Sequence, residues 1–93
     1  MGIETYVIGF NNGFEQLFIT FDIAYYDVIE VCTTDDINYA THFGSYKGCK
    51  RSYDIISNRL KYDGKKYIYH YDEDLAEDDD IKIMRVTTLI EEV

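Results

Sequence analysis

The residues of this chain with the clearest chemical potential are carboxylates, and they gather in one run at 72–80. Seven of these nine residues are acidic, namely Asp72, Glu73, Asp74, Glu77, Asp78, Asp79 and Asp80. Clustered carboxylates suit hard cations such as Ca²⁺. An EF-hand loop that starts at Asp72 would need an acid, a glycine and a glutamate where this chain has Ala76, Glu77 and Ile83. The run therefore does not match a calcium loop, and we expect no metal or cofactor.

Thiols and imidazoles are the next candidates for chemistry, and the chain has two of each: Cys32, Cys49, His42 and His70. Their spacing matches neither the H-E-x-x-H nor the C-x-x-C…H pattern of zinc sites. A nucleophilic Cys–His pair is decided in space rather than in sequence. Convergence of His42, His70 and Cys49 in one pocket would indicate an enzyme; without it, we expect none.

The charges of the chain are segregated into three blocks. Residues 1–46 carry a net charge of −7, residues 47–66 carry +5 and residues 67–93 carry −7, for a total of −9. General binding to DNA or RNA depends on Lys and Arg that displace counterions from phosphates. The overall acidity therefore argues against direct nucleic-acid binding, and the basic block is expected to lie against this chain's acidic flanks or a partner's acids.

Size and composition indicate one compact globular domain over residues 1–93. Hydrophobic residues make up 46% and charged residues 29% of the 93 positions, as in ordinary globular proteins. No apolar run approaches the roughly 18 residues of a membrane span. The first residues, MGIETYVIGF, also lack the basic region of a signal peptide. We therefore expect a cytoplasmic protein that has no membrane partner.

The first third of the chain shows the alternation of β-strands. Residues 3–10 and 14–21 are rich in β-formers, and Asn12-Gly13 between them is a strong hairpin signal. Residues 25–33 also alternate, which favours a third strand, although Asp22 is placed to cap a short helix there instead. The sequence thus predicts a hairpin followed by a strand or a short helix.

The rest of the chain mixes helical and extended patterns. Thr34 and the acids after it favour a short helix at 35–43, and apolar spacing after Ser52 favours a second helix that ends at Gly64. Strands are predicted at 66–71 and 81–90, with the run 72–80 as a loop or a short helical turn between them. These elements predict an α+β fold, a small antiparallel sheet of about four to five strands with two short helices on one face.

The acidity itself is the remaining functional signal. Seven charges over roughly 30 Å of extended chain are sparser than duplex phosphates, which come about every 1.7 Å, whereas a helical run of about 13 Å approaches that density. A run of either kind would need help from other acids or from a second subunit. The acids proposed to bind a partner beside the run are Asp27, Glu30, Asp35 and Asp36, and Asp22 is a further acid that could help the run.

In being short, strongly acidic and Tyr-rich, and through the run DEDLAEDDD, the chain resembles phage-encoded acidic DNA-mimic inhibitors of the anti-restriction and anti-CRISPR type. The resemblance implies a protein-interaction module that blocks a basic nucleic-acid-binding protein in the host cytoplasm by mimicking the DNA backbone. It implies no common fold and no residue roles. The basic block 47–66 departs from a uniformly acidic mimic.

Two other functions remain open from the sequence. An immunity protein or antitoxin would use the same acidic surface against a basic nuclease toxin, and a small enzyme or ligand-binding domain would need a concave pocket. Self-association is expected through a Tyr face of strand 66–71, formed by Tyr67, Tyr69 and Tyr71, in a two-fold homodimer.

Overall fold

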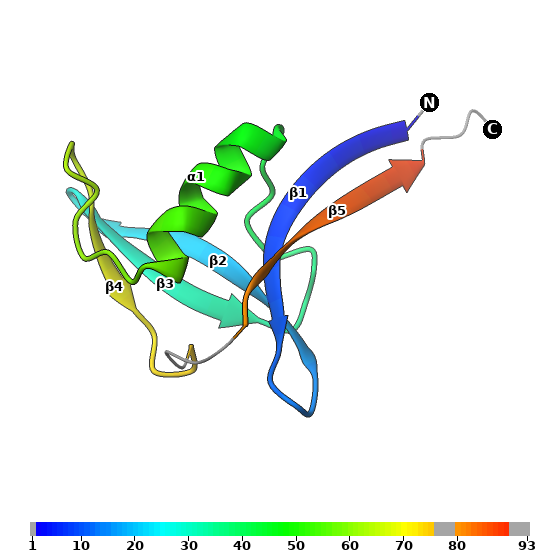
Figure 1. The fold of residues 1–93 in the computed structure, drawn as a ribbon, viewed down its shortest axis with the longest axis horizontal. Coiled ribbons are helices and arrows are strands. Elements are labelled where there is room, and N and C mark those ends of the chain that lie inside the picture. The colour runs from blue at the N-terminus through cyan, green and yellow to red at the C-terminus, as the bar shows by residue number, and fades with distance from the viewer. Residues whose placement is uncertain (1, 76–79, 90–93) are drawn as a thin grey trace.

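The computed structural model describes residues 2–75 and 80–89, and shows an α+β fold with a five-stranded sheet (Figure 1). Its elements are β1 (Gly2–Asn11), β2 (Gln16–Tyr25), β3 (Val28–Thr34), α1 (Tyr46–Ser57), β4 (Ile68–Tyr71) and β5 (Lys82–Leu89). The strand order is β4-β3-β2-β1-β5. The α+β class and the strand number are confirmed, but these residues form one helix where two were predicted.

The sheet is mixed rather than antiparallel. Strands β3 and β4 run parallel, with Val28 opposite Ile68 and Val31 opposite Tyr71, while the other neighbours are antiparallel. Parallel neighbours need a long crossover, and residues 35–67 provide one that contains α1. The antiparallel prediction was therefore wrong at the β3–β4 pair because α1 lies within the connection between these two strands.

The predicted hairpin and third strand are confirmed. The side-chain oxygen of Asn12 accepts hydrogen bonds from the amides of Phe14 and Glu15, both at 2.9 Å, and Gly13 has a φ of 94°. A positive φ favours glycine, which has no Cβ to clash. Beyond this turn, β2 and β3 pair around a second turn at Tyr26, so Asp22 lies within a strand and caps no helix.

The helix predicted at 35–43 is wrong because the end of this segment forms hydrogen bonds with β1 and β2 instead of with itself. Strands β1 and β2 pair only from Gly9 opposite Phe18 to their turn, and then they separate. The Thr41 amide donates to the Ile19 carbonyl at 3.1 Å, and the amides and carbonyls of Phe43 and Tyr6 exchange bonds of 2.8 and 2.9 Å. Residues 41–43 therefore fill the gap between the separating strands in an extended conformation.

The second predicted helix exists, but it begins and ends earlier. Ser45, not Ser52, is its N-cap, and its hydroxyl oxygen accepts the Gly48 amide at 3.1 Å. The helix ends at the C-cap Asn58, and Arg59 has a φ of 51°. The predicted start after Ser52 was wrong because Ser45 already offers the first turn of the helix an oxygen acceptor.

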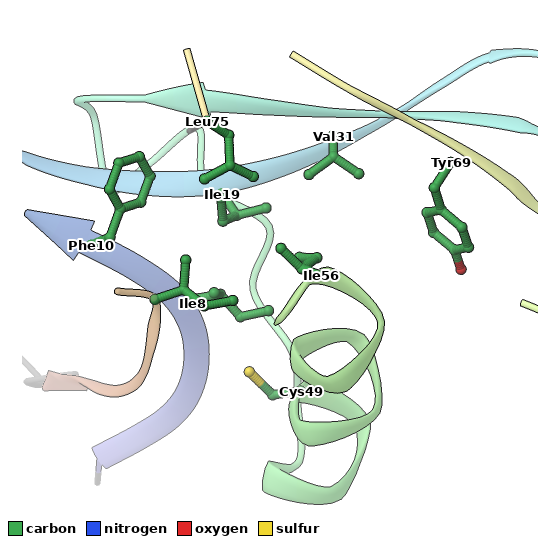
Figure 2. Close-up of a cluster of buried hydrophobic side chains, with 9 residues drawn as sticks. Ile8, Phe10, Ile19, Val31, Cys49, Ile56, Tyr69 and Leu75 are labelled. Carbon is green, nitrogen blue, oxygen red and sulfur yellow. The ribbon is translucent and has the colours of Figure 1, made fainter. Parts of the chain in front are cut away.

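The core lies between α1 and one face of the sheet. Figure 2 shows Cys49 and Ile56 pointing from α1 toward the sheet, where they meet buried side chains of three strands, namely Ile8, Phe10, Ile19 and Val31. Burial of these apolar side chains supplies most of the stability of so small a domain. Within the described ranges, no helix has the length and apolar character needed to cross a membrane.

Tyr67, Tyr69 and Tyr71, in β4 and directly before it, face this core, so the predicted Tyr face is not exposed. Tyr69 is only 8% exposed, Tyr67 and Tyr71 are half-buried, and the Tyr71 hydroxyl donates to the Leu60 carbonyl at 2.6 Å. Because side chains alternate along a strand, the exposed residues of β4 are Ile68 and His70 instead. The three tyrosines therefore pack into the core or against it and do not form an exposed face.

Gly9 allows the close approach at the point where β1 and β2 separate. A Cβ at this position would lie 3.0 Å from the Leu17 carbonyl oxygen and 2.9 Å from the Gln16 side-chain nitrogen. We expect Gly9→Ala to lower the free energy of unfolding by about 1–3 kcal/mol through steric strain. Gly44→Ala is the control, since no atom lies within 4 Å of its added Cβ. Equal urea midpoints for the two variants would contradict this account.

Candidate partner-binding surface

An acidic surface occupies the face of the sheet that α1 does not cover. Val31 points into the core, so its neighbours Glu30 and Cys32 point to the opposite face. The register places Asp22 of β2 directly opposite Glu30, and Glu30 opposite His70 of β4. Two carboxylates thus stand side by side on an exposed face, where like charges in directly opposed positions destabilise a sheet.

The acidic residues after β4 extend this surface. A cavity of about 270 Å³ is lined by Glu30, Cys32, His70, Tyr71, Asp72 and Glu73. The pKa of the Cys32 thiol is raised, first by burial and then by the charges of Asp22, Asp72 and Glu30. A raised pKa keeps the thiol protonated at neutral pH, which makes it a poor nucleophile. Cys32 and His70 share this cavity, but its acidity opposes thiolate chemistry.

The predicted acidic run is anchored to the core at the described parts of both ends. Leu75 is 3% exposed within the core cluster, and Ile81 is buried in the same cluster. The Asp72 amide donates to the Val31 carbonyl at 2.9 Å, and the Asp72 carboxylate accepts the Asp74 amide at 3.0 Å. Sequence analysis missed these anchors, although Leu75 is the one large apolar residue within the run and Ile81 directly follows it.

Glu77, Asp78 and Asp79 of the run lie outside the described residues, and so does the loop or helical turn predicted there. Asp80 is exposed and approaches the Lys82 ammonium at 3.8 Å. The structure therefore brings together Asp22, Glu30, Asp72 and Glu73, of which Asp22 and Glu30 were proposed from the sequence as acids that help the run.

The other predicted acids flank β3 at its two ends. Asp27 precedes β3 in an exposed turn, whereas Asp35 and Asp36 follow it. The Asp36 carboxylate accepts the Asn38 amide at 2.9 Å, so it also holds a turn. Because β3 and β4 are parallel, Asp35 and Asp36 lie at the same end of the sheet as Asp72. Asp27 lies at the opposite end, away from this group.

Two tyrosines beside Asp27 form an exposed aromatic tip that sequence analysis did not assign to the site. Tyr25 is 61% and Tyr26 is 91% exposed, and their rings pack edge to face with centroids 6.1 Å apart. Tyr26 has a φ of 49°, a left-handed conformation that costs about 1–2 kcal/mol for a residue with a Cβ. The tip therefore costs conformational free energy, and this chain does not offset that cost by burying either ring.

The residues whose convergence would indicate an enzyme lie apart. Cys49 of α1 points into the core and is fully buried, and burial raises the pKa of its thiol to about 11. The two ring nitrogens of His42 lie 2.8 Å from the Thr5 hydroxyl and the Ile37 carbonyl, which gives this ring a structural role. His70 is exposed on the open face. No group of three or more metal-ligating side chains occurs within residues 2–75 and 80–89.

The basic block does not neutralise the acidic surface in the described part of the chain. Its residues lie on α1 and in the loop that follows, and the ion pairs found there and elsewhere in these ranges are Lys50–Asp54 at 2.8 Å and Lys82–Asp80 at 3.8 Å. Arg59 reaches the acidic segment through the carbonyl of Leu75, not through a carboxylate. Asp22, Glu30 and Asp72 thus have no described cationic partner.

Comparisons of the chain with protein-family models, with curated proteins and with solved structures find no match. The candidate surface consists of solvent-facing carboxylates from β2, β3 and the segment after β4, with an aromatic tip at one end of β2 and β3.

The Cys32 thiol reports the electric field of this surface. Because Asp22 helps to raise the pKa of Cys32, Asp22→Asn should lower that pKa and increase the thiolate fraction at pH 8. We expect a disulfide reagent to label Cys32 severalfold faster in this variant than in the wild type. Glu4→Gln removes an equal charge from the distant part of β1 and should leave the rate unchanged. Equal rates in all three proteins would disprove the field.

Proposed function

We propose that this protein is an acidic interaction module that inhibits a basic nucleic-acid-binding protein by occupying the site of the phosphate backbone. The observation that carries the proposal is the opposed pair Asp22 and Glu30, which faces solvent together with Asp72 and has no described cationic partner. Mutual repulsion of these carboxylates weakens the fold. A cationic partner would convert that cost into binding free energy.

The arrangement of the acids favours a nucleic-acid-binding site as the target. Carboxylates accept paired hydrogen bonds from the Arg side chains that otherwise hold phosphates. Neighbouring strands lie about 4.8 Å apart, so acids on β2 and β3 and after β4 form a two-dimensional array rather than a single row. Such an array presents several negative groups to a positively charged groove at one time.

The aromatic tip supplies contact area that a purely electrostatic surface lacks. Tyr residues are enriched at the energetically important centres of interfaces because they are large, rigid and amphipathic. Tyr25 and Tyr26 lie next to Asp27 and are largely exposed. In this mechanism the carboxylates guide the encounter and set its salt dependence, and the two rings add apolar burial after contact.

The test is capture of a partner by the immobilised chain from a bacterial lysate, followed by competition with duplex DNA. We expect retention of a DNA- or RNA-binding protein that elutes as salt rises, because screening weakens exposed charge pairs. The double variant Asp22→Asn/Glu30→Gln should reduce affinity for that protein at least about tenfold, or about 1.4 kcal/mol. Duplex DNA should compete with the wild-type chain for the same protein.

The matched control is Glu4→Gln/Glu15→Gln, which removes the same total charge from exposed acids away from this surface. It should change affinity less than twofold. If both double variants bind equally well, or if DNA does not compete, phosphate mimicry by this surface is wrong. A captured nuclease toxin encoded beside this chain would instead identify an immunity protein that uses the same acids.

A further inference from the structure

Strand β5 is an edge strand whose outward backbone groups can be identified. The amide and carbonyl of Tyr6 bond to Phe43, so they point away from β5. In an antiparallel ladder, the residue opposite Tyr6, which is Arg85, must then point its own amide and carbonyl away from β1. Alternation along the strand extends the outward set to Ile83, Arg85, Thr87 and Leu89.

These outward groups have no backbone or side-chain hydrogen-bond partner within the described residues. Prolines and β-bulges commonly protect an edge strand from pairing with another chain. The β5 strand has no proline, and its pairing with β1 shows no bulge. Figure 1 shows β1 and β5 extending together beyond α1 as a two-stranded arm. A two-stranded ribbon without cover is marginal in water, so this arm would be stabilised by a further strand.

We propose that a second copy of this chain covers the arm, with the two β5 strands paired antiparallel about a two-fold axis at Val86. A two-fold centre at any residue of β5 keeps the outward groups in phase, and centres at Arg85 and Val86 give the longest pairing. A centre at Arg85 places like charges in opposition, and a centre at Thr87 shortens the pairing. The centre at Val86 places Arg85 opposite Thr87 and Ile83 opposite Leu89 of the second copy, and it joins two β-branched side chains at the axis.

The side chains fit this register. Tyr6 packs its ring against Tyr46 of α1, so Arg85 opposite Tyr6 and, by alternation, Ile83 and Leu89 point to the helix side of the sheet. A cavity of about 400 Å³ opens there between α1 and β5, and its lining includes Tyr46, Tyr53 and Ile83. Leu89 is 73% exposed in one chain. In the dimer it would lie beside Ile83 of the second copy, at this cavity.

The inference does not depend on the proposed function. β5 is one edge of the sheet and β4 is the other, and the acidic surface lies on β2, β3 and the segment after β4. The dimer would join two five-stranded sheets into one and leave both acidic surfaces open. Because the β5–β5 contact would be isologous, the dimer would present two copies of the acidic surface to a partner.

The first test is the mass of the full chain in solution, measured by light scattering from micromolar to millimolar concentration. We expect twice the monomer mass of 11.0 kDa at the upper end. Thr87→Pro removes an outward amide and should shift dissociation at least tenfold toward the monomer, while Thr87→Val keeps that amide and should dimerise as the wild type does. A monomeric wild type, or a fully dimeric Thr87→Pro, would overturn the proposal.

A cysteine pair tests the register independently. In a non-hydrogen-bonded antiparallel pair the Cα atoms lie about 4.5 Å apart, within disulfide range, so Val86→Cys should cross-link to its own copy on mild oxidation. Thr88→Cys is the matched control, because this register places Thr88 opposite Met84 and far from its own counterpart. Wild type, which keeps Cys32 and Cys49, should not cross-link. Cross-linking of Thr88→Cys, or none by Val86→Cys, would overturn the register.

Discussion

The divided pairing of β1 is the constraint on which the rest of the structure depends. This strand pairs with β2 over three residue pairs and with β5 over eight. Where β1 and β2 have separated, the amide and carbonyl of Tyr6 on the β2 side of β1 bond to Phe43 instead of to β2. The same separation moves the paired strands β1 and β5 away from β2, which produces the arm (Figure 1).

Sequence patterns predicted the elements whose signals are local. Asn12-Gly13 defined the hairpin because the turn needs an Asn acceptor and a positive φ, and alternation located β3, β4 and β5 to within a few residues. The patterns failed where contacts between residues far apart in the sequence determine the local conformation. Thr41 and Phe43 are extended because β1 and β2 need hydrogen-bond partners, and no local signal records that need. The helix start was misplaced between two serines that are both plausible N-caps.

The sequence showed which acidic residues could form the site, but not which of them lie next to one another in the fold. The run 72–80 was evident, yet its relation to Glu30 depends on the parallel β3–β4 pairing, which the predicted antiparallel sheet did not contain. Asp22 became a central residue because the β2–β3 turn falls at Tyr26 and sets it opposite Glu30. Likewise, alternation correctly grouped Tyr67, Tyr69 and Tyr71 on one face but did not tell which face meets α1.

The pairing of β1 with β5 also has a consequence for the order of folding. Gly2 lies opposite Leu89, so residues at the two ends of the described chain become neighbours. During synthesis β1 emerges long before β5, and its β5-facing edge must wait while the intervening elements form. Contacts of such sequence separation slow folding because loop closure precedes any gain from them. The β1–β2 hairpin can therefore form early, and the arm is completed only when β5 has left the ribosome.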